Sequence, residues 1–131
     1  DILFLIGSFG ASAVLLYGTP GVPLAQPRNL MGGHILSALT GVLMYGWIAD
    51  QLYLSGALSV ATAIAVMHLT KTTHPPGGAT ALIAVIGSER VHQLGFLYVL
   101  SPVALGALIM LVVALIVNNL ISFRRYPVFW W

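Results

Sequence analysis

Apolar stretches alternate with short breaks along the whole chain. Residues 2–18, 30–49, 52–70 and 97–122 carry no formal charge, and a shorter apolar stretch covers residues 79–86. As α-helices, the long stretches can cross most or all of a hydrocarbon core about 30 Å thick. The short one cannot cross it fully and indicates a half-helix. The pattern therefore predicts an all-α, polytopic membrane protein with four to five transmembrane helices, one or two of them broken or half-helices.

The breaks between these stretches are rich in residues that interrupt helices. Two glycines and three prolines fall between residues 18 and 27, and residues 74–78 read HPPGG. Proline lacks an N–H group and pushes the preceding residue out of the α region. We expect loops at both breaks and a third, more polar loop over residues 87–95. Asp1 opens directly onto an apolar run without a basic leader, which indicates that the sequence begins inside a longer protein.

Composition supports the membrane assignment. Only 6% of the 131 residues are charged and 59% are hydrophobic, and the mean hydropathy is +0.98. Soluble domains contain about 25% charged residues, because they must cover a core with polar surface. A surface that faces lipid removes this need. The length suits one domain, so we expect a single membrane-embedded domain over residues 1–131.

Several function classes find no support in the sequence. Without cysteine there is no disulfide, thiolate metal site or thiol nucleophile. The five basic residues are scattered, which argues against nucleic-acid binding. The four histidines lack the spacing of a metal site, and Ser8 does not lie in a GxSxG nucleophile elbow. We expect neither an enzyme nor a cofactor.

The few charged residues predict how the helices are oriented. If all five apolar elements cross the membrane, the loops alternate between its two sides. One side then receives Arg28, Lys71, Arg124 and Arg125, and the other receives Asp1, Asp50, Glu89 and Arg90. Basic residues concentrate in cytoplasmic loops. We therefore expect the HPPGG segment and the C-terminus on the cytoplasmic side, unless the half-helix turns back.

A short internal repeat adds a second prediction. Residues 10–13 read GASA and residues 78–81 read GATA, at an offset of 68 residues. Each is followed by a short apolar run, a break and a long stretch. With three crossings per offset, the second copy would be inverted, as in many transporters with a site at the midplane. Glycine and alanine are abundant here, so a chance match is the alternative.

The most informative segment runs from residue 68 to residue 80. Gly77 and Gly78 permit close backbone approach, and at the start of a helix their N–H groups would be free to bind an anion. Lys71 adds a charge and Thr80 a hydroxyl, and His74 begins the motif. These groups suit a small monovalent oxyanion. The alternative is that Lys71 only marks the membrane interface and that PPGG is a tight connection.

A second set of candidates precedes and enters the second long stretch. Arg28 can grip a planar oxyanion at two points, with Asn29 beside it, although Arg28 also fits a marker of membrane orientation. His34 lies within an apolar span, where ionisable groups usually face protein or water. It could pack in the interior, bind substrate or relay a proton. We expect His34 and His74 to lie close together.

Two stripes of small residues allow close helix packing. One contains Gly33, Ser37 and Gly41, and the other contains Ala57, Ala61 and Ala65. Five short helices offer little room for a sealed pathway within one copy. We therefore expect a homo-oligomer, with these stripes packing helices inside or between subunits.

The motifs together resemble the HPP family of integral membrane proteins. The resemblance rests on HPPGGATAL at residues 74–82, GSFGASAVLL at 7–16, PLAQPRN at 23–29, GGH at 32–34, VNNL at 117–120 and RRYP at 124–127. It implies a membrane domain of four or five helices. Some plastid and cyanobacterial members are associated with nitrite transport, while many bacterial members lack an assigned substrate.

The expected function follows from the residues and the resemblance together. We expect a transporter or channel for a small monovalent anion, most of all nitrite, in the bacterial inner membrane or alternatively the plastid envelope. The alternative function is a non-transporting membrane sensor or assembly subunit of a larger complex.

Overall fold

The computed structural model describes residues 6–131, and all regular structure in this part of the chain is helical. The expected span over residues 2–18 therefore begins outside the described residues, and Asp1 also lies outside them. In chain order, the elements are α1 (Gly7–Ala13), the π-helical η1 (Val14–Gly18), the 3₁₀ turn η2 (Pro23–Ala25), α2 (Pro27–Ile48), α3 (Leu52–Leu69), α4 (Pro76–Ile86), α5 (Glu89–Leu94), the π-helical η3 (Val99–Ala104) and α6 (Leu105–Asn119).

Three helical stretches are long and apolar enough to cross a membrane. They are Pro27–Ile48, Leu52–Leu69 and Val99–Asn119, whereas the apolar helix Pro76–Ile86 is shorter. The α1 helix continues directly into η1, so residues 7–18 form a fourth apolar helical segment. The prediction of an all-α, polytopic protein is confirmed, with a short helix at the expected place.

Three local predictions need correction. Helix α4 begins at Pro76, three residues before the expected start, because the first helical position needs no N–H group. The expected loop over residues 87–95 contains α5, which ends where Gly95 adopts a φ of 51°. The last span is not one continuous helix: Ser101 has extended angles (φ −140°, ψ 119°) before Pro102, as expected for a residue that precedes proline.

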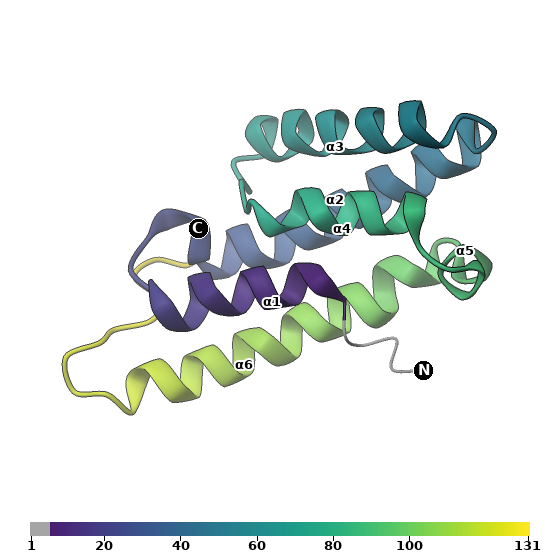
Figure 1. The fold of residues 1–131 in the computed structure, drawn as a ribbon. Coiled ribbons are helices and arrows are strands. Elements are labelled where there is room, and N and C mark those ends of the chain that lie inside the picture. The colour runs from purple at the N-terminus through teal and green to yellow at the C-terminus, as the bar shows by residue number, and fades with distance from the viewer. Residues whose placement is uncertain (1–5) are drawn as a thin grey trace.

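Successive long elements run in alternating directions (Figure 1). The loop over residues 19–26, the loop over 70–75 and the tail over 120–131 therefore gather at one end of the bundle. Hydrogen bonds join them there: Arg28 Nη2 donates to the Thr70 carbonyl over 2.7 Å, and the Val128 N–H donates to Gln26 Oε1 over 2.9 Å. The connections over residues 49–51 and 87–98 lie at the other end.

The charged residues follow this division. Arg28, Lys71, Arg124 and Arg125 lie at or beside the end formed by the three linked segments, which we call the basic end. Asp50, Glu89 and Arg90 lie at the opposite end. The grouping predicted from the sequence thus holds for the described residues, while the side of the membrane that each end faces stays a prediction.

One of the two small-residue stripes forms a tight seam between α2 and the segment that contains His74 and α4. A Cβ atom on Gly41 would lie 2.4 Å from the Ala81 carbonyl oxygen, and one on Gly33 would lie 2.4 Å from His74 Cβ. Such distances are below van der Waals contact, so only glycine fits. The second stripe, Ala57, Ala61 and Ala65, is exposed on α3.

Candidate functional site

Five polar side chains meet in the interior of the bundle. Ser8 and Ser12 come from α1, His34 from α2, His74 from the turn before α4, and Thr80 from α4; none is more than 1% exposed. We call this set the buried chain. Polar groups are costly inside a membrane protein unless they are paired, and they then often mark a functional site.

The two histidines are linked through one serine. Ser12 Oγ lies 2.7 Å from His34 Nε2 and 2.8 Å from His74 Nε2. The two imidazole ring centroids are 5.0 Å apart, so the prediction that His34 and His74 lie close together is confirmed. On its other side, His34 Nδ1 lies 2.7 Å from Thr80 Oγ1.

The hydrogen bonds extend beyond the two histidines on both sides. Thr80 Oγ1 is oriented to donate to Ser8 Oγ over 2.8 Å. At the other end, His74 Nδ1 lies 2.7 Å from the carbonyl oxygen of Leu24. A carbonyl oxygen can only accept, so His74 Nδ1 must carry the hydrogen. The hydroxyl of Tyr98 donates to the Thr80 carbonyl over 3.1 Å and fixes this turn of α4.

Glycines bring the histidines to this position. The missing side chain of Gly33 leaves room for His74 Cβ, and a Cβ atom on Gly77 would lie 2.7 Å from Ser37 Oγ and 2.8 Å from the Gly33 carbonyl oxygen. The α4 backbone therefore lies directly against α2 at Gly33, the residue that precedes His34. The Phe9 ring packs edge-on against His34, with centroids 5.2 Å apart.

The start of α4 differs from the expected anion site in one respect. The Gly77 N–H donates to the His74 carbonyl over 2.8 Å, and the Gly78 N–H donates to the Pro75 carbonyl over 3.1 Å. The expectation that these two groups are free is therefore wrong, because a tight turn uses them locally. Gly78 also has open space: a Cβ atom there would lie 3.7 Å from Val60.

The basic candidates lie apart from the buried chain. Arg28 is bonded to the Thr70 carbonyl, and Asn29 Nδ2 donates to the Thr73 carbonyl over 2.8 Å. Lys71 is exposed beyond the end of α3 at Leu69, with a φ of 56°. It therefore shares no helical face with His68. Arg28 and Asn29 hold the 70–75 loop in place, whereas Lys71 projects from it.

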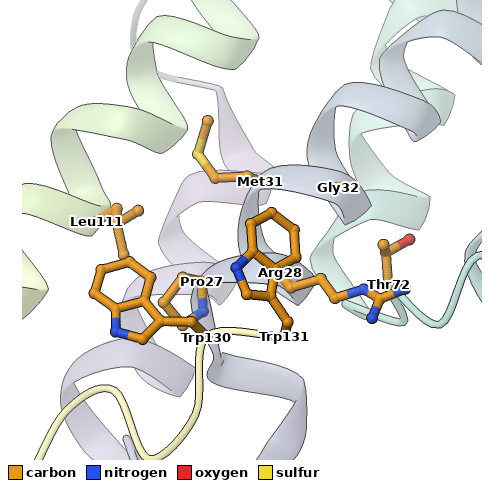
Figure 2. A pocket seen from close by; sticks show the side chains of 8 residues that line it. All are labelled: Pro27, Arg28, Met31, Gly32, Thr72, Leu111, Trp130 and Trp131. Atoms are coloured by element: carbon orange, nitrogen blue, oxygen red, sulfur yellow. The ribbon is translucent and has the colours of Figure 1, made fainter.

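Two surface cavities lie near the predicted residues. The larger, about 630 Å³, is at the basic end and is lined by Pro27, Arg28, Met31, Gly32, Thr72, Leu111, Trp130 and Trp131. Figure 2 shows Trp131 beside Arg28 and Trp130 beside Leu111 and Pro27. The second, about 510 Å³, is mainly apolar and is lined by Val60, Ile64, Met67, Thr73, Pro75, Gly78, Ala79 and Leu82. Neither cavity is lined by His34 or His74.

The sequence reasoning missed three members of this arrangement. Ser8, Ser12 and Tyr98 bind His34, His74 or Thr80 from segments distant in sequence, and only Ser12 had a signal. Ser12 and Thr80 occupy the same position in GASA and GATA, and in the structure each bonds one nitrogen of the His34 ring. The arrangement offers several hydrogen-bond donors and two ionisable rings, and none of the acidic side chains within residues 6–131 is bonded to either ring.

Comparison with known proteins agrees with the membrane fold. The family described as "HPP, transmembrane region" matches residues 1–127. Two transmembrane proteins of Dictyostelium discoideum are similar over almost the whole chain. One is 53% identical over 134 residues, covering 100% of this chain and 43% of the relative. The other is 48% identical over 130 residues, covering 97% of this chain and 45% of the relative.

The chain thus spans less than half the length of these curated relatives. Their source gives no support to the bacterial inner membrane expected from the sequence. No solved structure matches this chain.

Proposed function

Because this chain belongs to the HPP family of transmembrane proteins, we propose that it is a permeation module for a small monovalent anion. Its place in a membrane as an integral protein follows from the family and from the apolar helices. The observation that carries the proposal is the buried chain around His34 and His74. Hydrogen bonds between helices can stabilise a membrane bundle, but ionisable groups inside a membrane protein more often mark the pathway of an ion or substrate.

The charge distribution supports an anion as substrate. The basic end carries four of the five Lys and Arg residues of the sequence, and a concentration of one sign attracts the opposite ion. The proposed site comprises this end and the adjoining part of the buried chain: Arg28, Asn29, His34, Lys71, His74 and Thr80, with Gly77 and Gly78 in the turn that follows His74. Within it, Arg28 and Lys71 attract the anion and the buried groups bind it by hydrogen bonds.

Nitrite is the preferred anion within this proposal. It is small and planar and accepts hydrogen bonds, which suits neutral N–H and O–H donors in an interior of low dielectric constant. The preference itself comes from members of the family that are associated with nitrite transport. The relatives named above are described only as transmembrane proteins.

An inverted repeat would explain the position of the site. Helices α1 and α4 carry GASA and GATA and run in opposite directions (Figure 1), as do α2 and α6. Ser12 and Thr80, at corresponding positions, bond the two nitrogens of His34. Sites at the junction of two inverted short helices are typical of transporters. On this interpretation α1 with η1, and α4, also cross the membrane, which gives five crossings.

We also propose that the protein works as a homo-oligomer. The stripe of Ala57, Ala61 and Ala65 is exposed on α3, and small residues on an exposed face permit close contact with another helix. The mass of the purified protein in a mild detergent checks this, with a multiple of 13.9 kDa expected.

A second candidate function is a non-transporting membrane sensor or assembly subunit. It is favoured by one observation: the chain covers only 43% and 45% of its relatives, so the membrane region can serve a larger polypeptide.

Uptake of labelled nitrite into proteoliposomes separates the two candidates. We expect uptake that saturates with nitrite concentration and exceeds that of protein-free liposomes. The assay runs at alkaline pH, because undissociated nitrous acid, which crosses lipid unaided, is then scarce. Uptake equal to that of protein-free liposomes, by a protein shown to be correctly inserted, would reject the transport function and favour the sensor or subunit.

A further inference from the structure

The hydrogen bonds of the buried chain can be assigned from one fixed point. Since His74 Nδ1 must donate to the Leu24 carbonyl, the Nε2 atom of a neutral His74 is an acceptor, and the Ser12 hydroxyl donates to it. Ser12 then has no second hydrogen, so His34 Nε2 must donate to Ser12 Oγ. A neutral His34 then accepts at Nδ1 from the Thr80 hydroxyl. All donors point towards Leu24.

The same heavy atoms allow a second complete arrangement with one more hydrogen. If His74 is an imidazolium, its Nε2 donates to Ser12 Oγ, and the Ser12 hydroxyl donates to His34 Nε2. His34 Nδ1 then donates to Thr80 Oγ1, and Thr80 donates to Ser8 Oγ. This last orientation, Thr80 donating to Ser8, is the one in the structure. In the neutral arrangement Ser8 has to donate to Thr80 instead.

Proton hops along the chain convert the first arrangement into the second. A proton arrives at Ser8 Oγ, and the Ser8 hydrogen passes to Thr80 Oγ1. The Thr80 hydrogen passes to His34 Nδ1, the His34 Nε2 hydrogen passes to Ser12 Oγ, and the Ser12 hydrogen passes to His74 Nε2. One proton has entered, His74 holds one positive charge, and every hydroxyl again has one hydrogen. The four transfer distances are between 2.7 and 2.8 Å, so the two rings need not move, whereas Ser8, which accepts from Thr80 in the structure, has to turn so that it donates.

We propose that the buried chain takes up one proton with each transported anion and holds it on His74. Ser8 lies in the first turn of α1, whereas Leu24 belongs to the loop at the basic end (Figure 1). The proton therefore ends on the side of the buried chain that faces the basic end, where Arg28 and its neighbours attract an anion. A buried cation is costly, and an adjacent anion offsets that cost. This inference rests on the anion transport proposed above.

The groups packed around His34 and His74 indicate that these two rings are the groups that exchange protons. From α1 they face Ser12 and the Phe9 ring, from α4 Thr80, and from the η2 turn the Leu24 carbonyl. The Tyr98 phenol, from the residue just before η3, bonds the Thr80 carbonyl. The described acidic residues, Asp50 and Glu89, are exposed at the opposite end of the bundle.

Nitrogen NMR of labelled histidine tests the relay directly. His68 and His92 are replaced by glutamine, so that two imidazole rings remain. As pH falls, we expect His74 to change from the Nδ1–H form to imidazolium, and His34 to change at the same pH from the Nε2–H to the Nδ1–H tautomer. A His34 ring that keeps one tautomer while His74 titrates would overturn the relay, as would simultaneous protonation of both rings.

Substitution of Ser12 separates a relay from simple packing. In Ser12→Ala the two rings lose their link, and we expect His34 to keep one tautomer while His74 titrates. Ser12→Thr retains a hydroxyl and should restore the coupled change. Ser59→Ala is the control, because Ser59 is also fully buried but donates only to the Gly56 carbonyl within α3. Coupling that survives in Ser12→Ala would contradict the proposal.

A last experiment tests the link between the proton and the anion. Its result can contradict that link while the proton relay itself still holds. Nitrite or nitrate should raise the pH at which His74 becomes charged, because the anion stabilises the imidazolium. If the tautomer change occurs but neither anion moves it, the link between proton and anion is wrong, whereas the uptake assay decides separately whether an anion is transported. In transporting vesicles that carry a pH dye inside, we expect one proton per nitrite after the proton and nitrite entry of protein-free liposomes is subtracted. Nitrite uptake without protons would overturn the coupling alone.

Discussion

The buried chain and the basic end solve opposite electrostatic problems. The buried chain consists of neutral hydroxyl and imidazole groups that satisfy one another inside an apolar bundle. At the basic end, Lys71 and Arg125 are exposed, and Arg28 and Arg124 bond backbone carbonyls. Exposed charges act at long range and are screened by salt, whereas buried groups act only on what touches them.

The difference assigns separate tasks to the two regions. A formal charge inside the bundle would bind an anion too strongly for release, and transport requires a site that also lets go. A neutral site with reversible protonation avoids this problem. The basic end can then attract the anion towards the buried chain. We therefore expect transport to depend mainly on the buried chain and less on the basic end.

The largest expected effect concerns the side of the membrane that the basic end faces. The sequence has no cysteine, so single cysteines can be introduced at Lys71 and Glu89, which are exposed at opposite ends of the bundle. We expect an impermeant thiol reagent to label Lys71→Cys from the cytoplasmic side only, and Glu89→Cys from the other side only. Permeabilised membranes serve as the control in which both should react. Labelling of both from one side would refute the alternating arrangement.

A smaller effect is expected from the neighbours Gly77 and Gly78. Gly77→Ala forces a Cβ atom to within 2.7 Å of Ser37 Oγ and 2.8 Å of the Gly33 carbonyl, and such overpacking costs about 1–3 kcal/mol. Gly78→Ala meets nothing closer than 3.7 Å and should raise the free energy of unfolding by about 0.4–1 kcal/mol. Unfolding of the two variants in the same detergent measures the difference. Equal stabilities would show that α4 does not pack against α2 as described.

Parts of both regions were predictable from the sequence. The uncharged stretches identify the membrane helices because length and hydropathy are local properties. The proximity of His34 and His74 was also predictable, since each adjoins a glycine-rich break expected at the same end. The kink at Ser101 had a local signal in Pro102 that the uninterrupted apolar composition of residues 97–122 concealed.

The rest depends on contacts between distant segments. Ser12 bonds His34 and His74, which lie 22 and 62 positions away in the sequence. No local pattern identifies such a partner. The carbonyl groups that bind Gly77 and Gly78 depend on the detailed geometry of the turn, which HPPGG alone does not determine. The alanine stripe on α3 looks like the stripe on α2 in sequence, and only the packing shows that one is buried and the other exposed.

One pair of variants compares the two regions most directly: Thr80→Val and Lys71→Gln in the nitrite uptake assay. Thr80→Val removes the hydroxyl that joins Ser8 to His34, and we expect the uptake rate to fall by about tenfold or more, equivalent to about 1.4 kcal/mol. Lys71→Gln removes an exposed charge, so a loss of roughly twofold, smaller at high salt, is expected. Thr40→Val controls for loss of a buried hydroxyl, since Thr40 donates only to the Ser37 carbonyl. If Lys71→Gln abolishes uptake while Thr80→Val transports at the parental rate, the pathway lies at the basic end and the central claim is wrong.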